Sequence, residues 1–104
     1  MLFLSYWELN PDFDPSKLGD LAATLLKKKL YPAEGINEIA WYVSATDYWG
    51  LSIYEAETAE QMLRNIQMWR IAMPGLFKSI KTTICMDIVK MLPILSKLAK
   101  EVKE

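Results

Sequence analysis

The chain has 104 residues, with 12 basic and 13 acidic side chains, no histidine and a single cysteine, Cys85. That length suits one domain with its own hydrophobic core, and 52% of the residues are hydrophobic. The net charge of −1 argues against nucleic acid as a partner, because that partner requires clustered positive charge. Without histidine the chain can form neither a serine–histidine triad nor an ordinary zinc site, and a lone cysteine excludes an internal disulfide.

No targeting or membrane segment is expected. The apolar stretch at residues 2–9 is short and lacks the basic leader and cleavage site of a signal peptide. No apolar run approaches the roughly 20 residues needed to cross a bilayer. The sequence therefore predicts a soluble, cytoplasmic protein with no membrane partner, and an unpaired cysteine is compatible with a reducing compartment.

The first elements expected are a strand and a helix. Residues 2–9 are rich in aromatic and aliphatic side chains and end at the turn signal Asn10-Pro11-Asp12. Asp14-Pro15 then opens a helix, because Asp caps free backbone N–H groups and Pro suits the first helical position. Apolar residues spaced along one helical face extend it: Leu18, Leu21, Ala22, Leu25, Leu26 and Leu30.

A hairpin and a second helix follow. Residues 31–35 break the first helix, and the short turn between the strands expected at 36–45 and 48–55 predicts an antiparallel pair. Thr58 and Gln61 resemble a capping box, so a helix should begin there and end before Pro74. Its apolar stripe is predicted to be Met62, Leu63, Ile66, Trp69 and Met73.

Residues 76–86 alternate as a fourth strand, and a last helix is expected at about 87–103. Pro93 should kink this helix or mark where its regular part begins. The order β-α-β-β-α-β-α, with two crossovers of the preferred hand, predicts an α+β fold. It is a single ferredoxin-like domain over 1–104, with a four-stranded antiparallel sheet, two helices on one face and an added C-terminal helix.

Both faces of this sheet are predicted to be apolar. The first strand places Leu4 and Tyr6 on one face, and Phe3 and Trp7 on the other. Because a solvated sheet face is normally polar, we expect both faces to be covered. A symmetric homodimer with its sheets packed face to face provides this cover. The alternative is a monomer with the last helix folded across the sheet.

Several segments together resemble a known superfamily. They are Tyr31–Ile36, Trp41-Tyr42, Gly50–Glu55, Glu57–Glu60, Trp69 and Pro74–Phe77. In these segments the chain is similar, over nearly its whole length, to an uncharacterised branch of the dimeric α/β-barrel superfamily. The resemblance implies a ferredoxin-like protomer and a barrel formed by two sheets. Better-known relatives include cofactor-independent monooxygenases, haem-degrading enzymes and chlorite dismutase-like proteins, whereas this branch has no assigned reaction.

No catalytic residue, metal site or cofactor is predicted. Haem would lack an imidazole ligand, although tyrosine can bind ferric haem. The run Asn10-x-Asp12-x-Asp14 begins like a calcium loop, but Pro15 stands where that loop requires glycine. Cys85 lies in an apolar strand, which is typical of an inert buried thiol.

Candidate ligand-binding side chains come from the strands. They could line one pocket if their strand registers place them on one face, and otherwise they would fill the dimer seam. These candidates are Trp7, Tyr42, Ser52, Tyr54 and Thr83.

Three functions are compatible with this pattern. The first is a homodimer that binds a small, mostly apolar or aromatic ligand between sheet and helices. The second is a cofactor-independent monooxygenase-like enzyme acting on phenolic or quinol substrates. The third is a structural module whose aromatic face contacts another protein.

Overall fold

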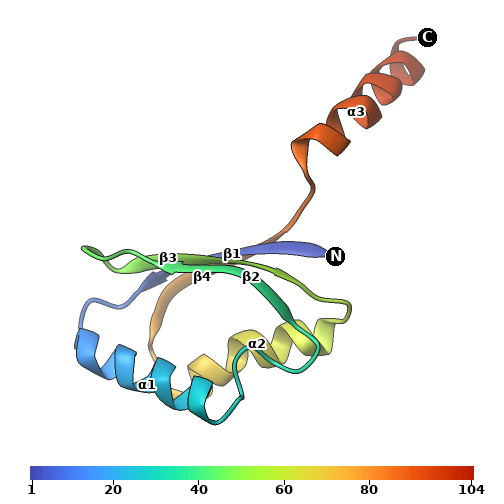
Figure 1. Cartoon of the computed structure of the whole chain (residues 1–104). Coiled ribbons are helices and arrows are strands. Elements are labelled where there is room, and N and C mark those ends of the chain that lie inside the picture. The colour runs from blue at the N-terminus through green and yellow to red at the C-terminus, as the bar shows by residue number, and fades with distance from the viewer.

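The structure, a computed structural model, describes residues 1–104 and contains seven elements. In chain order these are β1 (Leu2–Leu9), α1 (Pro15–Lys27), β2 (Asn37–Val43), β3 (Trp49–Glu55), α2 (Ala59–Ala72), β4 (Phe77–Cys85) and α3 (Ile88–Lys103). The four strands form one antiparallel sheet in the order β2-β3-β1-β4. Helices α1 and α2 lie together on one face of that sheet (Figure 1). The predicted ferredoxin-like α+β fold is confirmed.

Helix α1 begins as predicted but ends earlier. Asp14 accepts hydrogen bonds from the backbone N–H and the hydroxyl of Ser16, at 2.8 and 2.9 Å. At the other end Lys29 adopts a left-handed φ of 57°, and Leu30 N–H donates to the Leu25 carbonyl. This is a Schellman-type cap, which normally uses glycine. The prediction that Leu30 continues the helix is wrong, because the chain turns at Lys29.

Helix α2 has the predicted capping box. The Thr58 hydroxyl accepts from the Gln61 N–H at 3.2 Å, and the Gln61 side chain accepts from the Thr58 N–H at 3.1 Å. The predicted apolar stripe is wrong at one position, since Leu63 is 59% exposed whereas the neighbouring Asn65 is buried. Asn65 is buried because its amide oxygen accepts a hydrogen bond from the backbone N–H of Ala33.

The sheet has one covered face and one open face. Burial alternates along β1, where Phe3, Ser5, Trp7 and Leu9 are buried against the helices. The opposite side chains form the open face, which has an apolar centre and charged residues toward its edges and which we define as Leu4, Tyr6 and Glu8 of β1, Ala40 and Tyr42 of β2, Trp49, Leu51 and Ile53 of β3, and Lys81 and Thr83 of β4. No helix of the chain covers this face (Figure 1). The expectation that both faces are covered is therefore not met within one chain.

Helix α3 extends away from the domain. It contains no buried residue and rises from the end of β4 on the side of the open face (Figure 1). The chain is consequently elongated, with extents of 57 × 28 × 19 Å. The alternative of a helix folded across its own sheet is not what the structure shows. The helix continues through Pro93, and none of the helices is long and apolar enough to span a membrane.

Candidate ligand cavity

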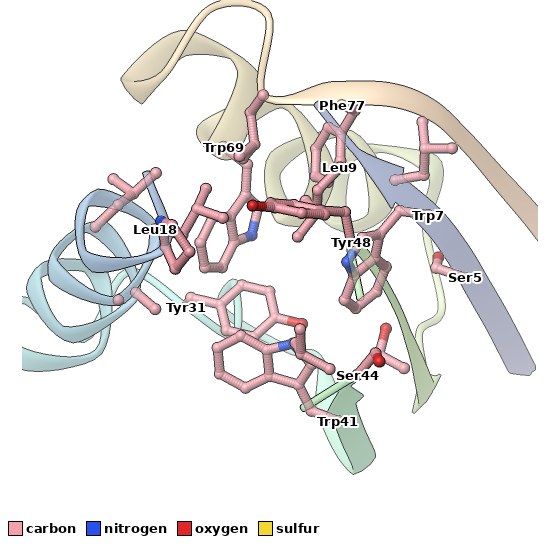
Figure 2. A pocket seen from close by; sticks show the side chains of 18 of the residues that line it. Ser5, Trp7, Leu9, Leu18, Tyr31, Trp41, Ser44, Tyr48, Trp69 and Phe77 are labelled. Carbon is pink, nitrogen blue, oxygen red and sulfur yellow. The ribbon is translucent and has the colours of Figure 1, made fainter. Parts of the chain in front are cut away.

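A cavity of about 450 Å³ lies between the covered face of the sheet and the two helices. Of its 23 lining residues, 15 are hydrophobic. This volume falls in the range of small-molecule sites, which are mostly apolar with a few placed polar groups. The aromatic side chains among the lining residues come from six different segments of the fold and point toward one another (Figure 2): Trp7, Tyr31, Trp41, Tyr48, Trp69 and Phe77.

Three of these rings form one continuous wall. Tyr31 lies 4.8 Å from Trp41 and 5.2 Å from Trp69 between ring centroids, and Trp41 lies 5.9 Å from Trp69. The rings are tilted or edge to face, arrangements that aromatic pairs favour. Because the rings touch one another, they leave no space for a cation enclosed among them. They present instead a continuous apolar surface to the cavity.

Trp7 occupies the other side of the cavity, next to a glycine. A Cβ built on Gly50 would lie 2.8 Å from Cζ2 of Trp7 and 2.7 Å from the Tyr42 carbonyl oxygen. Only glycine leaves room for the indole against the sheet at this position. Phe77, at a centroid distance of 6.4 Å from Trp7, continues the lining, and the β2–β3 loop contributes Tyr48.

The sheet contributes hydroxyl groups to the cavity. The Ser5 hydroxyl is hydrogen bonded to the Tyr54 hydroxyl at 3.0 Å and to the Thr82 hydroxyl at 2.9 Å. Ser5 and Ser52 both line the cavity and are 3% and 2% exposed. Polar atoms in so apolar a site can give a ligand its orientation.

One side-chain amide holds the aromatic wall in place. The Asn65 Oδ1 accepts a hydrogen bond of 2.8 Å from the buried Ala33 N–H. That bond attaches the segment carrying Tyr31 to helix α2. Asn65 therefore positions the wall as well as lining the cavity.

The hydroxyl of Tyr31 contacts the carboxylate of Glu38. This hydroxyl donates to Glu38 Oε1 at 3.0 Å, while Glu38 Oε2 is buried with no hydrogen-bond partner. Burial first, and then the Glu38 charge, raise the pKa of the Tyr31 phenol well above its ordinary 10.0, so the hydroxyl keeps its proton. Burial also raises the pKa of the Glu38 carboxyl above 4.5, an effect that the Tyr31 hydrogen bond partly offsets.

The lining disfavours anionic ligands. It contains no lysine or arginine, and its one ionisable carboxylate is Asp47 in the β2–β3 loop. Nowhere do three or more Cys, Asp or Glu side chains come together as a metal-ligand set. The indole N–H groups of Trp7, Trp41 and Trp69 have no acceptor in the protein, yet none is sealed from solvent. In Figure 2 these three nitrogen atoms lie toward the centre of the group of aromatic side chains. The cavity therefore offers hydrogen-bond donors to a ligand.

The five predicted ligand-binding residues do not lie together. Trp7 and Ser52 line the cavity. Tyr54 is fully buried beside it and reaches it only through the hydroxyl of Ser5. Tyr42, 69% exposed, and Thr83 lie on the open face. The registers place Tyr42 opposite Leu51 and Thr83 opposite Leu4, and so on the other side of the sheet from Trp7.

None of the three rings of the aromatic wall is among the predicted ligand-binding residues. The sequence pattern places Tyr31 in a helix-breaking turn and Trp69 in the apolar stripe of a helix. Their convergence depends on the packing of α2 against the segment before β2, which no local spacing reports. The available signal was the number of tryptophans, four in 104 residues, of which three line this cavity.

Comparison with known proteins adds no further constraint. A scan against protein-family models finds none that matches the chain, and a search of curated proteins finds no match either. What is shown is therefore the α+β arrangement with its four-stranded antiparallel sheet.

Proposed function

We propose that this protein is a homodimer whose protomers each bind a small, mostly apolar and uncharged ligand between sheet and helices. The observation that carries the proposal is the 450 Å³ cavity with its converging aromatic rings. Large aromatic side chains in a small domain normally fill the core. Here they surround a space large enough for a ligand.

The lining also indicates which ligand suits the cavity. A carboxylate or phosphate would find no cationic partner, and burying an unpaired charge is costly. A flat aromatic molecule can stack on one ring of the wall of Tyr31, Trp41 and Trp69 and meet the other two edge to face, because these rings are tilted to one another. Carbonyl or ether oxygens on that molecule would accept from the free indole N–H groups. The proposed ligand is therefore a neutral aromatic compound that carries acceptor oxygens.

The open face supports the homodimer. Its apolar centre would lie in water in a single chain, and a second copy of the same face is complementary to it by symmetry. The resemblance to the dimeric α/β-barrel superfamily points to the same assembly.

The ligand proposal can be tested with three matched naphthalenes and isothermal titration calorimetry. We expect 2-acetylnaphthalene, a neutral ketone, to bind at least tenfold more tightly than 2-naphthoate, which carries a charge, and 2-ethylnaphthalene, which lacks an acceptor. Trp41→Leu should weaken binding of the ketone at least tenfold. Trp49→Leu, on the open face, is the matched control and should leave it unchanged. Equal affinities for ketone and carboxylate, or equal effects of both variants, would contradict the proposal.

A cofactor-independent oxygenase is the second candidate. The observation in its favour is the group of indole donors, which would donate hydrogen bonds to the oxygen atoms of a phenolic or quinol substrate and hold it in place. Oxygen consumption with 1,4-dihydroxynaphthalene, compared with the rate without protein, tests it. Consumption that rises with protein concentration and is lost in Trp41→Leu supports the enzyme, and an unchanged rate leaves ligand binding alone.

A further inference from the structure

Two surfaces of this chain are apolar and have no partner within it. One is the open face of the sheet. The other is a stripe on α3, formed by Ile88, Leu92, Leu95, Leu98 and Val102, each between 49% and 76% exposed. Residues at this spacing share one side of a helix, and the lysines of α3 at positions 90, 97 and 100 lie on the other. Such a helix is stable in water only when its stripe is buried.

We infer that α3 is an exchanged arm, whose apolar stripe packs on the open face of the second protomer. This inference rests on the proposed homodimer and specifies what holds it together. The helix leaves β4 after only two residues, Met86 and Asp87, and Asp87 fixes its start by accepting from the Val89 N–H at 2.8 Å. The helix thus points away from its own sheet and toward the side on which a partner would stack (Figure 1).

The dimensions of the two surfaces match. A helix of 16 residues is about 24 Å long, and a strand of 8 residues such as β1 is about 26 Å long. Four strands span about 19 Å, so one helix about 10 Å wide covers half of the open face. The other half remains available for contact with the partner's sheet.

The area is sufficient for a stable dimer. The five side chains of the stripe are each about half exposed or more. If each loses about 100 Å², two exchanged helices bury about 1,000 Å² and the strands that they cover lose a similar area, whereas stable interfaces bury about 1,200–2,000 Å² in total. Twofold symmetry makes the exchange reciprocal, so both arms and both open faces are used.

The first test compares two adjacent charge substitutions in the full chain by light scattering and native mass spectrometry. The wild type should have twice the mass of the 12.0 kDa chain. Leu95→Glu places a charge in the stripe and should raise the dimer dissociation constant at least tenfold. Ser96→Glu adds the same charge outside the stripe and should leave the constant unchanged. Circular dichroism checks that both variants keep the wild-type fold.

The second test reports which protomer each arm contacts. In a Cys85→Ser background, one chain carries Leu51→Cys on the open face and another carries Leu98→Cys on α3. When the two are mixed and treated with a short bismaleimide, exchange predicts a covalent heterodimer. A chain that carries both substitutions distinguishes the two arrangements. An exchanged arm gives cross-links between protomers, whereas a helix that folds back on its own sheet gives cross-links within a monomer.

Each of the remaining outcomes would overturn a different part of this proposal. A dimer unaffected by Leu95→Glu would remove α3 from the interface and leave the homodimer intact. A wild-type monomer would remove both the homodimer and the arm, while ligand binding in the cavity stays separately measurable. A monomer that sediments with anionic phosphatidylglycerol vesicles through the same stripe would replace the second protomer with a lipid surface.

Discussion

Replacing Asn65 with leucine tests how the cavity wall is held. Asn65 is 3% exposed, and its Oδ1 is the acceptor for the Ala33 N–H at 2.8 Å. Leucine has a similar size but cannot accept a hydrogen bond, so the substitution leaves a buried N–H without a partner. Such a group costs about 1–3 kcal/mol. We expect Asn65→Leu to lower the free energy of unfolding by about 2 kcal/mol, which in a domain of this size lowers Tm by about 9 °C.

Urea and thermal denaturation followed by circular dichroism provide the measurement. Asn37→Leu is the matched control, because the exposed Asn37 amide donates only to Glu55 Oε1, and it should change stability by less than about 0.5 kcal/mol. Since the segment held by Asn65 carries Tyr31, the affinity for 2-acetylnaphthalene should also fall. An Asn65→Leu protein as stable as the wild type would refute the role given to this amide.

Gly50→Ala should destabilise by about 1–3 kcal/mol and weaken ketone binding, because the new Cβ would lie 2.8 Å from the Trp7 ring. Gly19→Ala, where no atom lies within 4 Å of the new Cβ, should raise the free energy of unfolding by about 0.5–1 kcal/mol. Urea denaturation measures both variants, and effects of the same sign on the free energy of unfolding would contradict this explanation. Glu38→Gln should stabilise by less than about 1 kcal/mol at neutral pH, because the raised pKa means that the ionised carboxylate is disfavoured in the folded state. That penalty is absent at pH values below the ordinary pKa of 4.5 and complete above the pKa of the folded state. A stability gain from Glu38→Gln that is as large below pH 4.5 as at neutral pH would therefore contradict this explanation.

The elements of the fold were predictable because their signals are local. The Asp14 cap, the Thr58–Gln61 capping box and the alternation along β1 depend on residues a few positions apart. The same locality explains the errors. Lys29 ends α1 in a conformation usually left to glycine, so no residue type announced the turn before Leu30.

The candidate site was only partly predictable, since it depends on register. Tyr42 and Trp41 are neighbours in the sequence, yet adjacent strand residues point to opposite faces, so one is on the open face and the other in the cavity. The register also shifts between Glu38 and Ala40, and this irregularity has no signal in the residue pattern.

By itself, then, the amino-acid order determined the seven elements, their succession and the apolar character of both sheet faces. Only the tertiary structure decided that the aromatic side chains of β1, β2, α2 and the segment before β2 surround a cavity, and that α3 extends away from its own sheet. The physical reason is the sequence separation over which each signal acts. Helix caps and side-chain periodicity depend on residues only a few positions apart. Which faces meet depends instead on contacts such as Asn65 with Ala33, 32 positions apart.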